Sequence, residues 1–111
     1  MKRTPEGQLQ RLVLDWLAAK HIFALRMQTG VLRNPAGRPV TFGIPGQADI
    51  LAFPQFSVVP PDYMHIVPLW IELKAPKGKQ SELQKSFQAK VEDEGHRYLL
   101  IRDLSELEAQ L

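Results

Sequence analysis

The chain has 111 residues, of which 44% are hydrophobic and 23% charged, proportions typical of a soluble globular protein. This length predicts a single domain over residues 1–111, and the absence of cysteine excludes disulfides, thiolate zinc sites and thiol nucleophiles. No apolar stretch approaches the roughly 20 residues of a membrane span, and the N-terminus lacks a signal-peptide pattern, so we expect a cytoplasmic protein.

The formal net charge is only +2, but the charges are unevenly distributed along the chain. Four basic residues and no acid lie between Trp16 and Ala48, and a second basic cluster follows around Lys74. Acidic residues gather instead in the C-terminal segment. A basic face of this kind fits a surface that binds a polyanion. Ordinary solvated charge would explain either cluster alone equally well.

The first predicted element is a helix, with Thr4 as a plausible N-cap and Pro5 at the first helical position. One apolar stripe follows helical spacing and comprises Leu9, Leu12, Val13, Trp16 and Leu17. Glu6 lies three residues before Leu9, so we place it on the same inward stripe. A carboxylate on the inward stripe needs a hydrogen-bond or charge partner, because unpaired burial is costly. The alternative is that Glu6 only stabilises the helix N-terminus by interacting with the helix dipole.

Apolar alternation predicts a strand over residues 22–28. Residues 29–47 are rich in glycine and proline and predict a loop, with the option of a short strand over 40–42. A second strand covers 48–53 and begins at Asp49, and prolines at 54, 60 and 61 bracket a further loop.

The third predicted strand covers residues 69–74, with Ile71 and Leu73 on one face and Glu72 and Lys74 on the other. A capping box at Ser81 opens a second helix that stops at Gly95. A fourth strand over 97–102 and a short terminal helix complete the chain. This order predicts an α/β fold with a mixed central sheet flanked by helices.

The Glu72 and Lys74 pair, with Asp49 on a neighbouring strand, has the groups needed to hydrolyse a phosphodiester. A divalent cation neutralises developing charge and lowers the pKa of a bound water. Asp49, Glu72 and the Leu73 backbone carbonyl would ligate this cation, and oxygen ligands suit Mg²⁺ or Mn²⁺. Lys74 would orient or deprotonate the water, or stabilise charge. A lone Glu-x-Lys, however, is more often a surface ion pair.

Glu6 and three sequence stretches carry a resemblance to a known family. The stretches are Gly43-Ile44-Pro45-Gly46-Gln47-Ala48-Asp49, Ile71-Glu72-Leu73-Lys74 and Gly78-Lys79-Gln80-Ser81-Glu82-Leu83-Gln84. With them the chain resembles the VRR-NUC (virus-type replication-repair nuclease) family of the PD-(D/E)XK superfamily, over nearly its whole length. Ala48 stands where the superfamily often has proline. The resemblance implies a restriction-endonuclease-like αβββαβ core.

The resemblance also implies roles for individual residues. Asp49, Glu72 and the Leu73 carbonyl would be metal ligands, Glu6 a further ligand, and Lys74 the catalytic lysine. Gln84 would be an auxiliary site residue. Its place in the capping box conflicts with that role, which leaves Gln80 as a rival.

The expected function is Mg²⁺- or Mn²⁺-dependent, structure-specific cleavage of branched DNA, such as four-way junctions or flaps, by a stand-alone, phage-type DNA-repair enzyme. The expected phosphate contacts are Arg26, Arg33, Arg38, Lys77 and Lys79. Two coordinated cuts at a junction favour a symmetric homodimer. The alternatives are a non-catalytic nucleic-acid-binding module that retains the fold, and a structural or toxin–antitoxin-type partner domain in which the carboxylates only form ion pairs.

Overall fold

The fold is given by a computed structural model that describes residues 5–28, 30–58 and 63–111. The predicted N-cap at Thr4 and the prolines at 60 and 61 lie outside these residues. The elements in chain order are α1 (Pro5–Ala19), β1 (Phe23–Arg26), β2 (Gly30–Arg33), β3 (Pro39–Phe42), β4 (Ile50–Phe53), β5 (Gln55–Val58), β6 (Tyr63–Ile66), β7 (Leu69–Leu73), α2 (Glu82–Asp93), β8 (Arg97–Ile101) and α3 (Leu104–Glu108).

The centre of the molecule is a four-stranded sheet with the strand order β1-β4-β7-β8. β1 pairs with β4 and β4 with β7 in antiparallel fashion, whereas β7 and β8 run parallel and are joined through α2. A parallel pair requires a crossover of this kind. The predicted mixed sheet flanked by helices is therefore confirmed.

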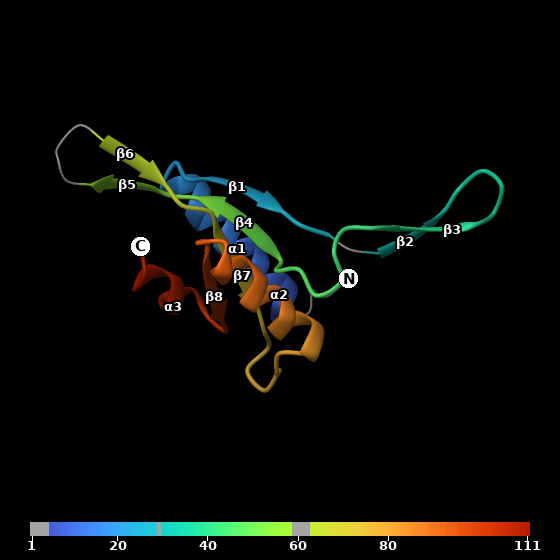
Figure 1. The fold of residues 1–111 in the computed structure, drawn as a ribbon. Helices are drawn as coiled ribbons and strands as arrows, with labels where there is room; N and C mark the ends of the chain where they lie inside the picture. Colours follow the sequence, from blue (N-terminus) through green and yellow to red (C-terminus); the bar gives the residue numbers. More distant parts are fainter. Residues whose placement is uncertain (1–4, 29, 59–62) are drawn as a thin grey trace.

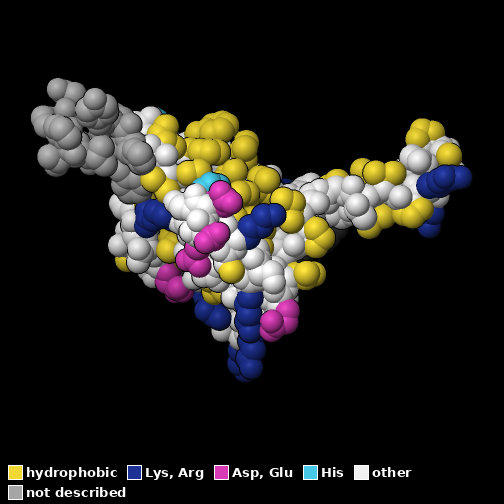
Figure 2. All heavy atoms as spheres, in the orientation of Figure 1, with side chains coloured by type: hydrophobic (Ala, Val, Ile, Leu, Met, Phe, Trp, Pro, Cys, Tyr) yellow, Lys and Arg dark blue, Asp and Glu magenta, His cyan; other side chains and the backbone are white. Residues whose placement is uncertain are grey.

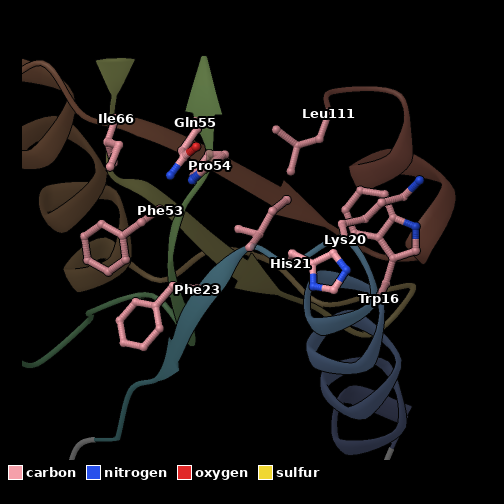
Figure 3. A pocket seen from close by; sticks show the side chains of 10 residues that line it. Trp16, Lys20, His21, Phe23, Phe53, Pro54, Gln55, Ile66 and Leu111 are labelled. Atoms are coloured by element: carbon pink, nitrogen blue, oxygen red, sulfur yellow. The ribbon is translucent and has the colours of Figure 1, made fainter. Parts of the chain in front are cut away.

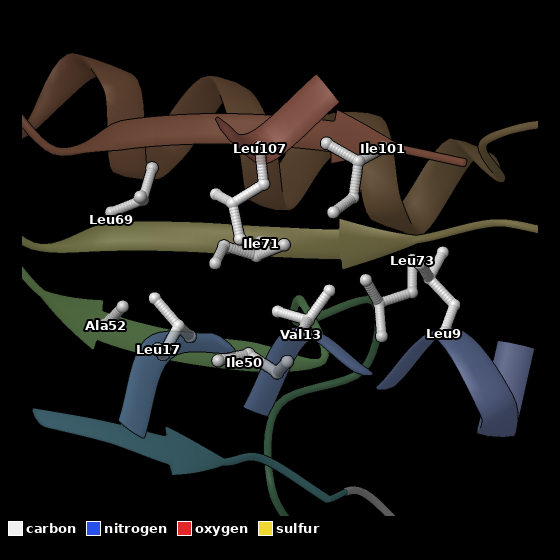
Figure 4. Packing of buried hydrophobic residues seen from close by; sticks show 10 residues of the cluster. All are labelled: Leu9, Val13, Leu17, Ile50, Ala52, Leu69, Ile71, Leu73, Ile101 and Leu107. Carbon is white, nitrogen blue, oxygen red and sulfur yellow. The ribbon is translucent and has the colours of Figure 1, made fainter. Parts of the chain in front are cut away.

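Two hydrophobic clusters cover the two faces of this sheet. On one face α1 contributes Leu9, Val13 and Leu17, which pack on residues of β4 and β7 such as Ile50 and Ile71 (Figure 4). Leu107 of α3 joins the same cluster. On the other face Phe87 and Val91 of α2 pack with Ala48 and Tyr98, and the Trp70 ring meets Phe87 edge to face at 4.9 Å.

The alternation predicted for the third strand is confirmed by these clusters. Ile71 and Leu73 belong to the cluster under α1. Trp70 packs in the cluster under α2, so Glu72, two residues later, points toward the α2 face. In contrast, Leu12 of the predicted apolar stripe is 54% exposed.

Two hairpins extend from the sheet where the sequence predicted mainly loops; the short strand expected over 40–42 is confirmed by β3. β2 and β3 form one two-stranded hairpin, inserted between β1 and β4, and β5 and β6 form another between β4 and β7. They project at opposite ends of the molecule, which measures 55 × 31 × 26 Å (Figure 1). Every residue of β3 is exposed, so this strand lacks the one-sided burial that produces a period-two pattern.

Among the described residues, no helix has both the length and the apolar character needed to cross a membrane.

Candidate metal and nucleic-acid site

A polar cavity of about 240 Å³ lies where β4 begins and β7 ends. Its lining brings together four residues that were singled out from the sequence, Glu6, Arg26, Asp49 and Leu73. They come from α1, from the end of β1, from the residue preceding β4 and from the last residue of β7. Three strands and a helix N-terminal turn therefore converge on one edge of the sheet.

Asp49 is held in this cavity by its neighbours on both sides. Its backbone N–H donates to the Ile71 carbonyl at 3.1 Å, and its own carbonyl accepts from the Met27 N–H at 2.8 Å. The carboxylate Oδ2 accepts from the Leu73 N–H at 2.7 Å. The side chain is thereby directed across the end of β7, next to Glu72.

Glu72 is 2% exposed and is the one charged side chain that is buried among the residues the structure describes. Burial, together with the hydrogen bond to Asp49 and the charge of Asp49, raises the pKa of Glu72 from 4.5 to about 8. The charge of Lys74 and a hydrogen bond from Tyr98 act in the opposite direction. Near neutral pH the protonated form of Glu72 is therefore favoured, next to the carboxyl group of Asp49.

The donor chemistry of this pair fits a hard divalent cation. Two carboxyl groups from adjacent strands meet, and a cation between them would replace the Glu72 proton and relieve the repulsion between the two charged groups. Leu73 and Glu6 line the adjoining cavity. Among the described residues, however, no three His, Asp or Glu side chains are clustered closely enough to hold a metal in this arrangement.

Glu6 stands apart from the acid pair and serves a structural contact. It is exposed, unlike the inward position expected from the stripe. Its Oε1 accepts a hydrogen bond from the Ala75 N–H at 3.2 Å. The carboxylate thus has the partner that its position predicts, and this partner is the backbone just after β7.

The predicted basic residues fall in three places. Arg26 lines the cavity itself. Lys77 and Lys79 are exposed on the loop between β7 and α2, and Arg33 and Arg38 are exposed on the β2–β3 hairpin. Figure 2 shows basic side chains at the far end of this hairpin and along the lower edge of the molecule, near the β7–α2 loop. Arg33 donates to the Gly37 carbonyl at 2.7 Å, which braces the hairpin turn.

Lys74 follows β7 directly and is partly buried. It lies close enough to Glu72 for its charge to lower the pKa of that acid. The structure therefore brings together Asp49, Glu72 and Lys74, the three residues on which the sequence argument depended most.

The two rival glutamines have separate partners. Gln84 Oε1 accepts from the Ser81 N–H at 2.8 Å, and the Gln84 N–H donates to Ser81 Oγ at 3.2 Å, which completes the capping box of α2. Gln80 Nε2 instead donates to the Tyr98 hydroxyl at 3.1 Å. Because Tyr98 contacts Glu72, Gln80 is the glutamine connected to the acid pair, and Gln84 is committed to the helix cap.

Tyr98 was interpreted from the sequence only as a core residue. Its hydroxyl donates to Glu72 Oε1 at 3.3 Å. The contact follows from the parallel register in which Trp70 is opposite Tyr98 and Glu72 is opposite Leu100. A tyrosine inside an apolar strand is the only signal of this role in the sequence, and it does not identify the partner.

The loop that leads to Asp49 is fixed by Gly46. This residue has a φ of +83°, and a Cβ added to it would lie 2.4 Å from the Leu83 carbonyl oxygen at the start of α2. Gln47 adds a hydrogen bond from its Nε2 to the Gln28 carbonyl at 3.0 Å. Only glycine allows this close approach, so Gly46 anchors the segment before Asp49 on α2.

A larger cavity of about 880 Å³ lies elsewhere, beside the start of β1 and the end of α1 (Figure 3). Aromatic and aliphatic side chains such as Trp16, Phe23, Phe53 and Leu111 line it, and Phe23 and Phe53 stack with ring centroids 5.7 Å apart. None of the described residues that line it is acidic, so their chemistry differs from that of the Asp49 cavity.

Comparison with known protein families, with curated proteins and with solved structures finds no match to this chain.

Proposed function

We propose that this protein is a divalent-metal-dependent, structure-specific DNA endonuclease of the VRR-NUC type, with a restriction-endonuclease-like core. One observation carries the proposal: the carboxyl groups of Asp49 and Glu72 meet at the ends of two adjacent strands, with Lys74 beside them. A buried acid with a raised pKa, such as Glu72, beside a polar cavity is typical of functional sites. The α1-β1-β4-β7-α2-β8 order also supports an αβββαβ core.

In this proposal Asp49 and Glu72 hold Mg²⁺ or Mn²⁺, with the Leu73 backbone and Glu6 at the edge of the same cavity. The bound metal would lower the pKa of a coordinated water and neutralise charge on the phosphodiester. Lys74 orients or deprotonates the attacking water, or stabilises the charge that develops on the phosphate. Arg26 lines the cavity, and in the proposal it contacts the phosphate of the cleaved strand.

DNA contacts in the proposal extend in two directions from the cavity. Arg33 and Arg38 lie on the β2–β3 hairpin, and Lys77 and Lys79 lie on the β7–α2 loop. Basic side chains on separate protrusions suit contacts to phosphates on different arms of a branched DNA, where shape rather than base sequence is recognised. Two cuts at a four-way junction would be made by a symmetric homodimer.

The test is a cleavage assay on a four-way junction, a flap and a linear duplex, with Mg²⁺, Mn²⁺ or EDTA. We expect metal-dependent cleavage of the branched substrates. Lys74→Ala should lower the rate by at least about 10²-fold, the range for loss of a proton-transfer group. Asp49→Asn keeps an acceptor for the Leu73 N–H and should also be inactive. Lys85→Ala, which removes an exposed lysine paired with Glu82, is the control. Full activity of the Lys74→Ala protein would refute the mechanism.

The second candidate is a non-catalytic nucleic-acid-binding module. It is favoured by the internal pairing of the acids, because Glu6 accepts from Ala75, Asp49 from Leu73, and Glu72 from Tyr98. DNA binding without metal-dependent cleavage of any of the three substrates would select this candidate.

A further inference from the structure

A chain of hydrogen bonds reaches Glu72 from the side of α2. Gln80 Nε2 donates to Gln88 Oε1 at 2.9 Å and to the Tyr98 hydroxyl oxygen at 3.1 Å. The Tyr98 hydroxyl then donates to Glu72 Oε1 at 3.3 Å. Tyr98 is 8% exposed and Glu72 is 2% exposed, so these bonds form largely away from water.

The chemistry of each group fixes the direction of this chain. A tyrosine hydroxyl has one hydrogen to donate, and its oxygen accepts from Gln80. Its hydrogen is therefore free to point at Glu72. Gln88 supplies a carbonyl oxygen, which holds the Gln80 amide with its NH₂ group toward Tyr98.

We propose that Tyr98 and Gln80 are positioning residues for the Glu72 carboxyl group, and that they hold it facing Asp49 so that the two acids can bind one divalent cation. This inference rests on the proposed function, since it assumes that Glu72 is a metal ligand. Tyr98 and Gln80 themselves act through Glu72 and contact neither metal nor DNA.

The identity of the donor supports this role. A neutral hydroxyl fixes the orientation of a carboxylate without neutralising its charge, whereas an arginine would form an ion pair that competes with a cation. Carboxylates that bind metals are commonly oriented by such outer hydrogen bonds, and loss of one typically costs 10–100-fold in metal affinity or activity.

The experiment measures the Mn²⁺ dissociation constant by electron paramagnetic resonance, without DNA, for the parent protein and three variants. Tyr98→Phe removes the hydroxyl and should weaken Mn²⁺ binding about 10–100-fold. Gln80→Leu removes the donor to Tyr98 and should weaken binding in the same direction, but less. Gln84→Leu is the matched control, because Gln84 lies four residues away and its side chain bonds to the Ser81 N–H in the helix cap, whereas Gln80 bonds to Tyr98.

A second readout separates positioning from damage to the fold. Cleavage by the Tyr98→Phe protein should fall at low Mn²⁺ and recover to near the parent rate at saturating Mn²⁺, while the circular dichroism spectrum stays unchanged. The Gln84→Leu protein should lose thermal stability but keep the parent Mn²⁺ affinity.

The outcomes distinguish this inference from the function on which it rests. If the parent protein binds Mn²⁺ and both Tyr98→Phe and Gln80→Leu bind it equally well, the positioning role is overturned and the metal site stands. If the parent protein binds no Mn²⁺, the proposed metal site fails, and the positioning role is overturned with it. If Gln84→Leu weakens binding as much as Gln80→Leu, the effect belongs to the N-terminus of α2 and not to the hydrogen-bond chain.

Discussion

Replacement of Glu72 by glutamine should stabilise the metal-free protein at alkaline pH and remove part of its dependence on pH. Glutamine has the shape of a protonated glutamate, so it can accept from Tyr98 and donate to Asp49 as the neutral acid does. Unlike glutamate, it cannot ionise. The substitution therefore keeps the hydrogen bonds and eliminates the cost of a buried second charge.

The sign and size of the effect follow from the pKa values of the two states. Glu72 has a pKa near 4.5 in the unfolded chain and about 8 in the fold. Below 4.5 both states hold the proton, and as the pH rises the unfolded chain releases it first. Unfolding is then favoured, so stability falls between about pH 4.5 and 8. At about 1.4 kcal/mol per tenfold difference in proton affinity, the loss approaches roughly 4 kcal/mol by pH 8.

The assay is urea denaturation in EDTA at several pH values from 5 to 8, followed by circular dichroism. The free energy of unfolding of the parent protein, minus that of Glu72→Gln, should decrease steadily as the pH rises across this range. Subtraction removes the contribution of the histidines, which both proteins share. Glu82→Gln, at an exposed position on α2, is the control and should follow the parent protein.

The reasoning about Glu72 is refuted if the parent protein and Glu72→Gln show the same dependence on pH. A stabilisation by Glu72→Gln that is already complete at pH 5 would also contradict it, because the acid is still protonated in the fold at that pH.

Two further predictions concern the loop before Asp49 and the β2–β3 hairpin. Gly46→Ala should destabilise the protein by several kcal/mol in urea denaturation, because it combines a positive φ with a clash against the Leu83 carbonyl. Gly37 is the control: it has a φ of +82° but open space around it, so Gly37→Ala should cost only about 1 kcal/mol. Equal losses of stability in the two variants would show that the clash at Gly46 is relieved. Arg33→Ala and Arg38→Ala should each weaken binding to branched DNA and reduce the slope of log affinity against log salt concentration by about one. An unchanged slope would show that the hairpin does not contact DNA phosphates.

The features that could be predicted from the sequence are those specified by neighbouring residues. The capping box of Ser81 and Gln84 depends on residues three apart, and both of its hydrogen bonds are present at the start of α2. The two faces of β7 follow from the strand period, which places Glu72 away from Ile71. These features depend only on residues close together in the sequence, so the local sequence is enough to predict them.

The features that were missed depend on contacts between distant residues or on exposure. The role of Tyr98 requires the register of β8 on β7, which local patterns do not encode. The β2 strand exposes Val31 and Leu32 to solvent, so its apolar residues are adjacent and do not alternate with polar ones. Glu6 was placed inward from helical spacing, but it is exposed one turn before the buried Leu9, and spacing alone does not tell where burial along a helix begins.

The hydrogen bond between Glu6 and Ala75 has a consequence for the order in which the molecule forms. It joins residues 69 positions apart, so the cavity that contains Asp49 is closed only after about two thirds of the chain has been synthesised and α1 has docked beside β7. Contacts of this sequence separation form late in folding because a long loop must close first. Truncated chains that end before β7 therefore contain α1 and Asp49 but no cavity, and separately produced halves of the chain should regain it only by associating.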